Sequence, residues 1–328
     1  MGDASPAQKP RWVTLQDEIN ALPGMSDVKG AVNIVVNNAM ANKMRVAAGL
    51  KPEEMNYNLL LTGSPGTGKT TIARKLGELY HELGIVKSPE VAQLTRADLV
   101  GQFANTAAAT TKEQIDKNRG KLIFIDEAYT LYNGPTDQEG RQALDELMRL
   151  SEEYRNDTVI VLAGYDEHME RLFSANPGLK SRFRRRLDLP DYTPAEKVRV
   201  LDYMMNENKR MFANAQTRKR AAQYAAAMPS VGEHGNARAV RNFYDSIREA
   251  QAERLVSEFA GSPHDIPEDA FMTFTAADVE LAAAEMKLPR PTAKPRKKRP
   301  THVTESARVG YAKRKALRPV SHVPVASP

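Results

Sequence analysis

The segment GSPGTGKT at residues 63–70 is the feature that most limits what this chain can fold into. It matches G-x-x-x-x-G-K-[ST], a turn whose glycines let backbone N–H groups close around phosphate oxygens. An apolar run precedes it at residues 58–61, and apolar residues at helical spacing follow it as far as Leu83. A phosphate-binding loop requires this strand–loop–helix context. The sequence therefore predicts a nucleotide-binding α/β domain that uses ATP.

A second apolar segment, LIFIDE at residues 122–127, ends in two carboxylates. A buried strand would deliver Asp126 to the edge of the sheet where Mg²⁺ on the nucleotide lies. Glu127, one residue further, is predicted to orient and deprotonate the attacking water. The alternative is that the pair only caps a helix N-terminus.

The phosphate loop supplies the remaining predicted contacts to ATP and Mg²⁺. Lys69 is placed to reach the β- and γ-phosphates, and the Thr70 hydroxyl is placed to reach the metal together with Asp126. The residues predicted to bind the cofactor are Gly63, Ser64, Pro65, Gly66, Thr67, Gly68, Lys69, Thr70, Thr71 and Asp126.

Five short apolar runs alternate with helical or loop segments through the first part of the chain. Such a pattern is typical of a parallel sheet covered on both faces. Helical spacing is also visible before the first run, up to Lys51-Pro52, where the proline is expected to end the helix. The expected strands are residues 57–61, 91–95, 121–125, 159–163 and 186–189.

After the last strand only helical patterns are visible, up to about Leu288. Thr193, Pro194 and Glu196 form a helix start, with a capping box and a proline at the first helical position. The expected organisation is a flexible N-terminus (residues 1–14), the α/β domain with its N-terminal helices (15–190), a small all-α domain (191–288) and a tail (289–328).

Composition narrows the class of protein. The chain has 328 residues and no cysteine, which excludes disulfides, thiolate zinc sites and cysteine nucleophiles. No apolar run approaches the ~18 residues needed to span a bilayer, and the N-terminus lacks the pattern of a signal peptide. We therefore expect a cytoplasmic protein without a membrane partner.

The net charge of +6 is unevenly distributed. Residues 289–328 contain eleven Lys or Arg and one acidic residue, which gives this tail a charge of +10 and leaves about −4 for the rest. A segment so rich in charge and proline cannot bury enough apolar surface to fold, so we expect disorder. Two interpretations stay open: a contact with nucleic acid or another acidic partner, and a non-specific solubilising tail.

Several motifs in order, GSPGTGKT, LIFIDEAY, VIVLAGY, NPGLKSRF, LPDY and GNARAVRN, resemble those of the AAA+ ATPases. The chain is most similar to the red-type rubisco activase group (CbbX/CfxQ-like) and to the AAA+ module of type VII secretion chaperones (EccA-like). The resemblance covers residues 15–286. It implies an AAA+ P-loop fold with a helical lid, and a ring, usually a hexamer, with ATP bound between neighbouring subunits.

The resemblance also implies roles for two arginines. Arg182 matches the arginine finger that enters the ATP site of the next subunit, although Arg184, Arg185 and Arg186 lie beside it. The alternative is that these four form only a solvated basic edge. Arg238 matches the sensor 2 arginine, which the lid brings to the γ-phosphate; the alternative is an arginine on a helix surface.

Two regions depart from the pattern of the AAA+ proteins. The fourth strand usually ends in a polar sensor 1 residue, but this chain has Ala163-Gly164, so Tyr165, Asp166 and Asn176 are all candidates. In the loop after the second strand, Phe103 and Ala104 occupy the place of the aromatic–hydrophobic–glycine motif that grips a threaded peptide. No basic residue lies between Asp98 and Thr111. The alternative is that Phe103 anchors this loop in the core.

The leading hypothesis is a ring-forming ATPase that remodels a protein substrate through central pore loops, as rubisco activases or secretion chaperones do. The alternative is a nucleic-acid motor or loader that uses the basic tail. Because AAA+ modules serve both classes, the fold cannot distinguish them.

Overall fold

The computed structural model describes residues 9–101, 103, 105–230, 232, 234–260 and 266–290. Of the predicted regions, most of the N-terminal segment, pore-loop residue Ala104 and nearly all of the tail lie outside the described residues.

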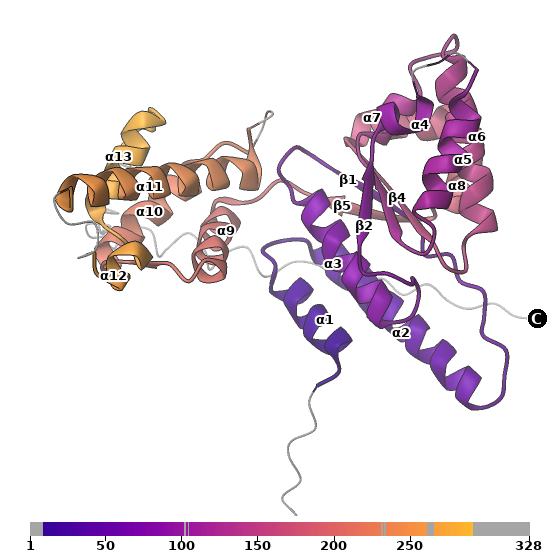
Figure 1. The fold of residues 1–328 in the computed structure, drawn as a ribbon, viewed down its shortest axis with the longest axis horizontal. Coiled ribbons are helices and arrows are strands. Elements are labelled where there is room, and N and C mark those ends of the chain that lie inside the picture. The colour runs from indigo at the N-terminus through magenta and orange to yellow at the C-terminus, as the bar shows by residue number, and fades with distance from the viewer. Residues whose placement is uncertain are drawn as a thin grey trace, which may run out of the picture. The chain divides into compact units, whose positions relative to one another are not determined.

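A five-stranded parallel sheet forms the first domain, in the order β2-β3-β4-β1-β5 (Figure 1). The three central strands β1, β3 and β4 are mostly apolar and buried at every position, as expected for a sheet covered on both faces, whereas the outer strands β2 and β5 are only partly buried. The five strands are β1 Leu59–Gly63, β2 Val91–Leu94, β3 Leu122–Ile125, β4 Val159–Gly164 and β5 Arg185–Leu189.

Helices cover both faces of this sheet. Alternate residues along each strand point to opposite faces, so Leu59 and Leu61 join one apolar cluster with α1, α2 and α3, while Leu60 joins another with α4 to α8. The elements are α1 Arg11–Ala21, α2 Ser26–Ala47, α3 Lys69–Glu82, α4 Arg96–Val100, α5 Ala107–Lys117, the 3₁₀ turn η1 Ala128–Leu131, α6 Gln138–Glu153, α7 Asp166–Ala175 and α8 Gly178–Arg182.

Helix α2 ends before the expected proline. Its last residue is Ala47, and Gly49 follows with a φ of +74°. The N–H of Leu50 donates to the Arg45 carbonyl (2.9 Å) and the N–H of Gly49 to the Val46 carbonyl (3.0 Å). This is the Schellman pattern, in which a left-handed glycine ends a helix. The glycine therefore ends α2, and Pro52 lies beyond it.

The second domain is helical, and it also contains one short strand pair that the helical patterns did not predict. The capping box of Thr193 with Glu196 is confirmed at the start of α9. The two-residue strands β6 and β7 pair in parallel and join distant parts of this lid. Its elements are α9 Pro194–Glu207, β6 Met211–Phe212, α10 Ala215–Ala227, α11 Asn236–Glu258, α12 Glu268–Met272, β7 Thr273–Phe274 and α13 Ala276–Glu285.

Among the described residues, no helix combines the length and the hydropathy needed to cross a bilayer.

Candidate active site

The phosphate loop connects β1 to α3 through a turn that requires glycine. Gly66 and Gly68 have φ values of +75° and +96°, a region that L-residues rarely adopt. A Cβ on Gly63 would collide with the carbonyl of Leu189, and one on Gly66 would collide with the carbonyl of Gly235. The glycines therefore allow both the turn and the close approach of other backbone segments.

Lys69, the first residue of α3, turns its ammonium back into this loop. Its Nζ donates to the carbonyls of Gly63 (2.7 Å) and Ser64 (3.0 Å) and lies 5.3 Å from the centre of the Tyr165 ring. Burial lowers the pKa of Lys69, while the nearby Asp126 carboxylate partly opposes this shift. The ammonium is therefore already positioned at the centre of the turn.

Thr67 stabilises the loop through two hydrogen bonds. It is buried, and its hydroxyl donates to the Ser64 carbonyl (2.8 Å). Its own carbonyl accepts a hydrogen bond from the Tyr192 hydroxyl (3.1 Å). Burial raises the pKa of Tyr192 to about 12, so this hydroxyl stays a donor. Of the predicted cofactor residues, Thr67 shapes the pocket together with Gly63 and Ser64 but does not line it.

A pocket of about 220 Å³ opens beside the loop and brings together most of the predicted site. Its walls come from the phosphate loop, the ends of β3 and β4, and the start of α11. The lining residues are Pro65, Gly66, Gly68, Lys69, Thr70, Thr71, Asp126, Glu127, Gly164, Tyr165, Ala237, Arg238 and Arg241.

Asp126 and Glu127 leave β3 in an unusual conformation. Asp126 Oδ1 accepts the N–H of Glu127 (3.0 Å), and Glu127 has a left-handed φ of +48°. The Glu127 carbonyl accepts both the N–H (2.8 Å) and the hydroxyl (2.7 Å) of Thr130. Glu127 precedes η1, but its side chain makes no capping hydrogen bond. The capping alternative is therefore wrong for Glu127, and both carboxylates line the pocket.

These residues suit a nucleotide with its metal rather than a metal held by protein alone. Among the described residues, no group of three or more His, Cys, Asp or Glu side chains could hold an ion. Mg²⁺ is commonly bound by one or two protein oxygens together with phosphates and water. Thr70 and Asp126, which both line the pocket, match that limited donor set.

The lid reaches the phosphate loop through Asn236, the first residue of α11. Asn236 is fully buried, with a left-handed φ of +58°. Its Nδ2 donates to the carbonyl of Pro65 (3.1 Å), to the carboxylate of Asp191 (2.8 Å) and to the carbonyl of Ser230 (2.8 Å). Its Oδ1 accepts the N–H of Tyr192 (2.9 Å). One side chain therefore joins the lid, the loop and the segment between the domains.

Arg238 and Arg241 project from α11 into the pocket. The N–H of Ala237 donates to the carbonyl of Gly66 (3.1 Å), which fixes this end of α11 against the loop. Arg238 is an exposed residue of α11 that lines the pocket, and its sensor 2 role stays a prediction. Arg241 was not predicted; its spacing of three residues from Arg238 places it on the same helix face.

Arg182 lies outside the pocket of its own chain. Its guanidinium donates to the carbonyls of Met148 (3.1 Å, from Nε) and Gly178 (3.2 Å, from Nη1) at the end of α8. Any role for Arg182 at an ATP site requires a second copy of the chain.

The three sensor 1 candidates are separated by the structure. Tyr165 lines the pocket. Asp166 begins α7 and pairs with Arg186 (3.0 Å). Asn176 ends α7, where its Oδ1 accepts the N–H of Gly178 (3.2 Å). Only Tyr165 of the three lies in the pocket wall.

Phe103 is exposed between α4 and α5, with 76% of its surface accessible. Its carbonyl accepts the Thr106 hydroxyl (2.7 Å), and the N–H of Asn105 donates to the Glu139 carboxylate. The alternative that Phe103 anchors the loop in the core is wrong.

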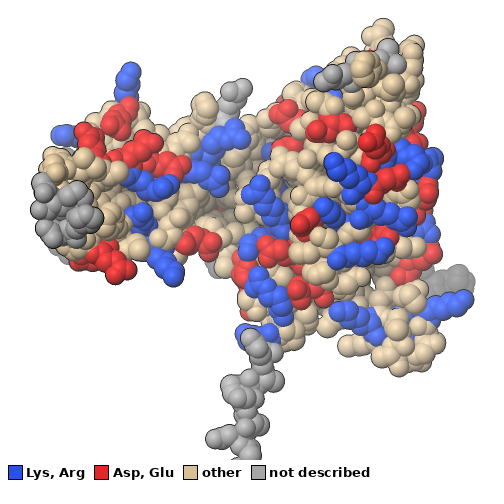
Figure 2. Space-filling model, viewed as in Figure 1, with Lys and Arg blue, Asp and Glu red and all other residues tan. Residues whose placement is uncertain are grey.

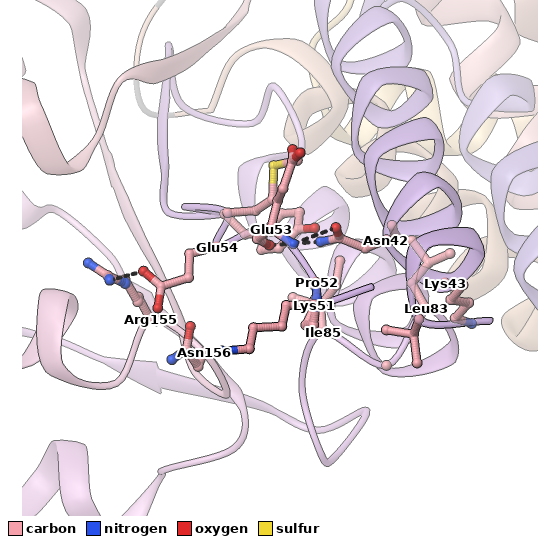
Figure 3. Close-up of a pocket in the computed structure, with 15 residues that line it drawn as sticks. Asn42, Lys43, Lys51, Pro52, Glu53, Glu54, Leu83, Ile85, Arg155 and Asn156 are labelled. Atoms are coloured by element: carbon pink, nitrogen blue, oxygen red, sulfur yellow. Dashed lines mark hydrogen bonds and ion pairs between the residues drawn. The ribbon is translucent and has the colours of Figure 1, made fainter. Parts of the chain in front are cut away.

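A larger cavity, of about 680 Å³, lies at the opposite edge of the sheet, next to the N-terminal ends of β1 and β4 (Figure 3). Its walls are the end of α2, the end of α3, the segment before β1 and the turn before β4. These segments precede strands, whereas the nucleotide pocket is built from segments that follow them. None of the predicted site residues lines the larger cavity.

Comparisons with known proteins agree with this geometry. Residues 59–191 match the family described as "ATPase family associated with various cellular activities (AAA)", and residues 193–288 match the AAA lid domain. The chain is 36% identical to the chromosomal protein CbxX of Cupriavidus necator over 79% of its length and 80% of the relative. It is 34% identical to protein CbbX of Cereibacter sphaeroides, over 83% and 86%. It is 35% identical to the chloroplastic ribulose bisphosphate carboxylase/oxygenase activase of Cyanidioschyzon merolae, over 74% and 82%.

Proposed function

Because the chain belongs to the AAA+ ATPases, in the group of the CbbX and CfxQ proteins, we propose that it forms a ring, a hexamer, that remodels a protein substrate. ATP hydrolysis drives the ring, and Phe103 from each subunit grips the substrate in the central pore. The exposure of Phe103 carries the proposal, since this large aromatic side chain between α4 and α5 is accessible for contact with a substrate. The relative from C. merolae makes ribulose bisphosphate carboxylase/oxygenase the first candidate substrate.

Different pocket residues have different roles in ATP hydrolysis. Lys69 and the loop N–H groups would hold the β- and γ-phosphates, and Thr70 and Asp126 would hold Mg²⁺. When bound, Mg²⁺ neutralises charge on the phosphates. Glu127 orients the attacking water and accepts its proton. Arg238, with Arg241 beside it, supplies positive charge from the lid to the γ-phosphate.

Arg182 completes the site of the neighbouring subunit. An arginine finger supplied by a partner is worth roughly 10³–10⁵ in rate. Arg182→Ala is expected to bind ATP normally and to hydrolyse at least ~100-fold more slowly. Mixing it with Lys69→Ala subunits is expected to restore part of the rate, because some interfaces then join an intact loop to an intact finger. Hydrolysis at the wild-type rate by a strictly monomeric preparation would contradict a shared site.

The pore variant tests the substrate class. Phe103→Ala is expected to keep the basal ATPase rate within a few-fold and to lose stimulation by the protein substrate. Val256→Ala is the matched control, because Val256 is also strongly exposed (71%) but lies on α11 of the lid. Stimulation of both variants at the wild-type level would contradict a role for Phe103 in gripping substrate.

Nucleic acid is the rival partner. On the face shown in Figure 2, basic and acidic side chains are interspersed over the described part of the chain. The charge of +10 in residues 289–328 is then the main candidate for phosphate contacts, which weaken steeply with salt. Stimulation by DNA that disappears when residues 289–328 are deleted, with Phe103→Ala unaffected, would replace the protein-remodelling proposal by its rival.

A further inference from the structure

Arg182 lines a groove of about 400 Å³ together with two other arginines. Those two, Arg149 and Arg155, each pair with two carboxylates. Arg182 pairs with no carboxylate of the described residues, and its Nε and Nη1 donate to the carbonyls of Met148 and Gly178. Its Nη2 donates to no group in the described part of the chain. This nitrogen is therefore available to a phosphate from outside the chain.

The backbone of Arg182 is held by a side chain from a distant segment. Arg182 is the last residue of α8, a helix of only five residues. The last carbonyls of a helix have no donor within that helix. The carbonyl of Arg182 accepts a hydrogen bond from Nδ2 of Asn56 (2.9 Å), a residue 126 positions away in the sequence. The side-chain amide of Asn56 thus supplies the donor that α8 lacks.

Asn56, in the segment between α2 and β1, is itself fixed in orientation. Its Oδ1 accepts the N–H of Asn58 (2.8 Å), which closes a local turn. Asn58 is buried, and its side chain accepts the N–H of Ile160 (2.8 Å) in β4. Exchanging the oxygen and the nitrogen of the Asn56 amide would break both of its hydrogen bonds. Its N–H group therefore faces Arg182.

The residue after Arg182 holds the chain on the other side. Phe183 is buried, with its ring centre 6.5 Å from that of Phe173, and its N–H donates to the Leu179 carbonyl (2.8 Å). Arg182 thus lies between a phenylalanine packed in the core and a carbonyl bound by Asn56. Its backbone is restrained while one nitrogen of its guanidinium stays available.

We propose that Asn56 is a positioning residue for ATP hydrolysis, which fixes the backbone of Arg182 so that the guanidinium meets the phosphates of the neighbouring subunit. This inference rests on the proposed role of Arg182 as an arginine finger. Asn56 does not line the nucleotide pocket, so it acts through Arg182 and not on the ATP of its own chain. Small displacements matter at such a site, because a misplacement of about 1 Å can cost roughly 100-fold in rate.

The test is Asn56→Ser. The serine hydroxyl still accepts the N–H of Asn58, as in other local turns, but it is too short to reach the Arg182 carbonyl. We expect kcat for ATP hydrolysis to fall roughly 10-fold, because the finger is no longer held in one place. The affinity for ATP is expected to stay within about twofold, since no pocket residue has changed.

Asn42→Ser is the matched control. Asn42 lies at the same edge of the sheet, and its amide also joins two segments, through the N–H and the carbonyl of Glu53 (both 2.9 Å). Neither of these hydrogen bonds reaches α8. We expect this variant to keep both kcat and ATP affinity, so a general effect of losing an asparagine amide would appear in both variants.

Mixed rings show on which side of the shared site the defect lies. Lys69→Ala subunits keep an intact finger, so adding them to Asn56→Ser subunits is expected to raise the ATPase rate. Arg182→Ala subunits lack the finger, so adding them is expected to give no increase. The reverse pattern would place the defect in the nucleotide pocket of the variant's own chain and would overturn the proposal. No increase with either partner would mean a general structural defect and would overturn it too.

Failure of this inference differs from failure of the role of Arg182. If Arg182→Ala hydrolyses ATP at the wild-type rate, the finger role is wrong and the inference falls with it. If Arg182→Ala is slow while Asn56→Ser matches Asn42→Ser, only the role of Asn56 is overturned.

Discussion

The two cavities at opposite edges of the sheet differ in how their charges are used. In the larger one, Arg155 pairs with the Glu54 carboxylate, as Figure 3 shows, and Glu53 in the wall pairs with Arg45 (3.1 Å), which lies outside the lining. In the smaller one, Lys69 is held by backbone carbonyls that a phosphate can replace. Volume therefore does not identify the site. The site is identified by cations and carboxylates that converge on a glycine-rich turn.

At each edge the side chain of an asparagine forms hydrogen bonds that join neighbouring segments, and these two asparagines differ in burial. Asn42 on α2 is partly accessible; it accepts the N–H of Glu53 and donates to its carbonyl (both 2.9 Å). Asn236 on α11 is fully buried and holds four partners. A hydrogen bond that water can replace stabilises less than one that water cannot reach. The hydrogen bonds at the edge of the sheet next to the phosphate loop, the phosphate edge, are therefore expected to stabilise more.

The largest expected effect distinguishes the lysines of the two cavities. Lys69→Ala is expected to weaken ATP binding at least ~100-fold, because charge-assisted contacts to two phosphates are lost. Lys51→Ala, in the wall of the larger cavity, is expected to bind ATP like the wild type. Titration calorimetry with ATP and Mg²⁺ measures both. Equal loss in the two variants would mean that the larger cavity also serves the nucleotide.

The asparagine pair gives the next largest effect. Asn236→Ala is expected to lower the free energy of unfolding by about 3 kcal/mol, since buried partners lose their hydrogen bonds and alanine disfavours a φ of +58°. Asn42→Ala is expected to cost less than about 1 kcal/mol. Denaturant unfolding compares them. Equal costs would show that burial does not set the difference between the two edges.

Much of the fold is predictable because its signals are local. Most strands are apolar runs, and the observed strands agree with the expected ones to within two residues at each end. The expected first strand begins at Tyr57, but β1 begins at Leu59. The N–H of Asn58 donates to the side chain of Asn56 (2.8 Å), which forms a local turn before the strand. The pair β6 and β7 was missed because two residues have no periodicity.

The candidate site likewise contains residues that the sequence identifies and residues that only the structure identifies. The phosphate loop and Asp126-Glu127 are contiguous motifs, so sequence alone finds them. Tyr165 was one of three sensor 1 candidates and Arg241 was not predicted; both enter the pocket through the approach of β4 and α11. Such contacts between distant segments leave no local pattern, and the structure is needed to find them.

Asp137 gives a smaller, pH-dependent effect near the phosphate edge. It caps α6, and its carboxylate receives two hydrogen bonds from Arg96 (2.7 and 2.8 Å), which also donates to the Thr130 carbonyl. These bonds, chiefly those from Arg96, lower the pKa of Asp137 to about 2. An unfolded aspartate titrates near pH 3.9. The stabilisation is therefore present above about pH 4 and is lost as the pH falls towards 2.

Asp137→Asn isolates this charge, because asparagine still caps the helix. At pH 7 we expect a loss of about 2 kcal/mol in the free energy of unfolding, and near pH 2 almost none. Denaturant unfolding across this range tests the window. A cost that does not depend on pH would mean that the ion pair with Arg96 contributes nothing.

The smallest expected effect belongs to the ion pair of the larger cavity. Arg155 and Glu54 have exposed side-chain fractions of 32% and 64%, so water and salt screen their attraction. Glu54→Gln is expected to change the free energy of unfolding by less than about 0.5 kcal/mol, and by less still at 1 M salt, where the Debye length is about 3 Å. Asp137→Asn at pH 7 is the reference, since the Asp137 side chain is only 10% exposed. If Glu54→Gln costs as much as Asp137→Asn and resists salt, the larger cavity is held as firmly as the phosphate edge. The two edges would then differ only in whether their cations are available to a ligand.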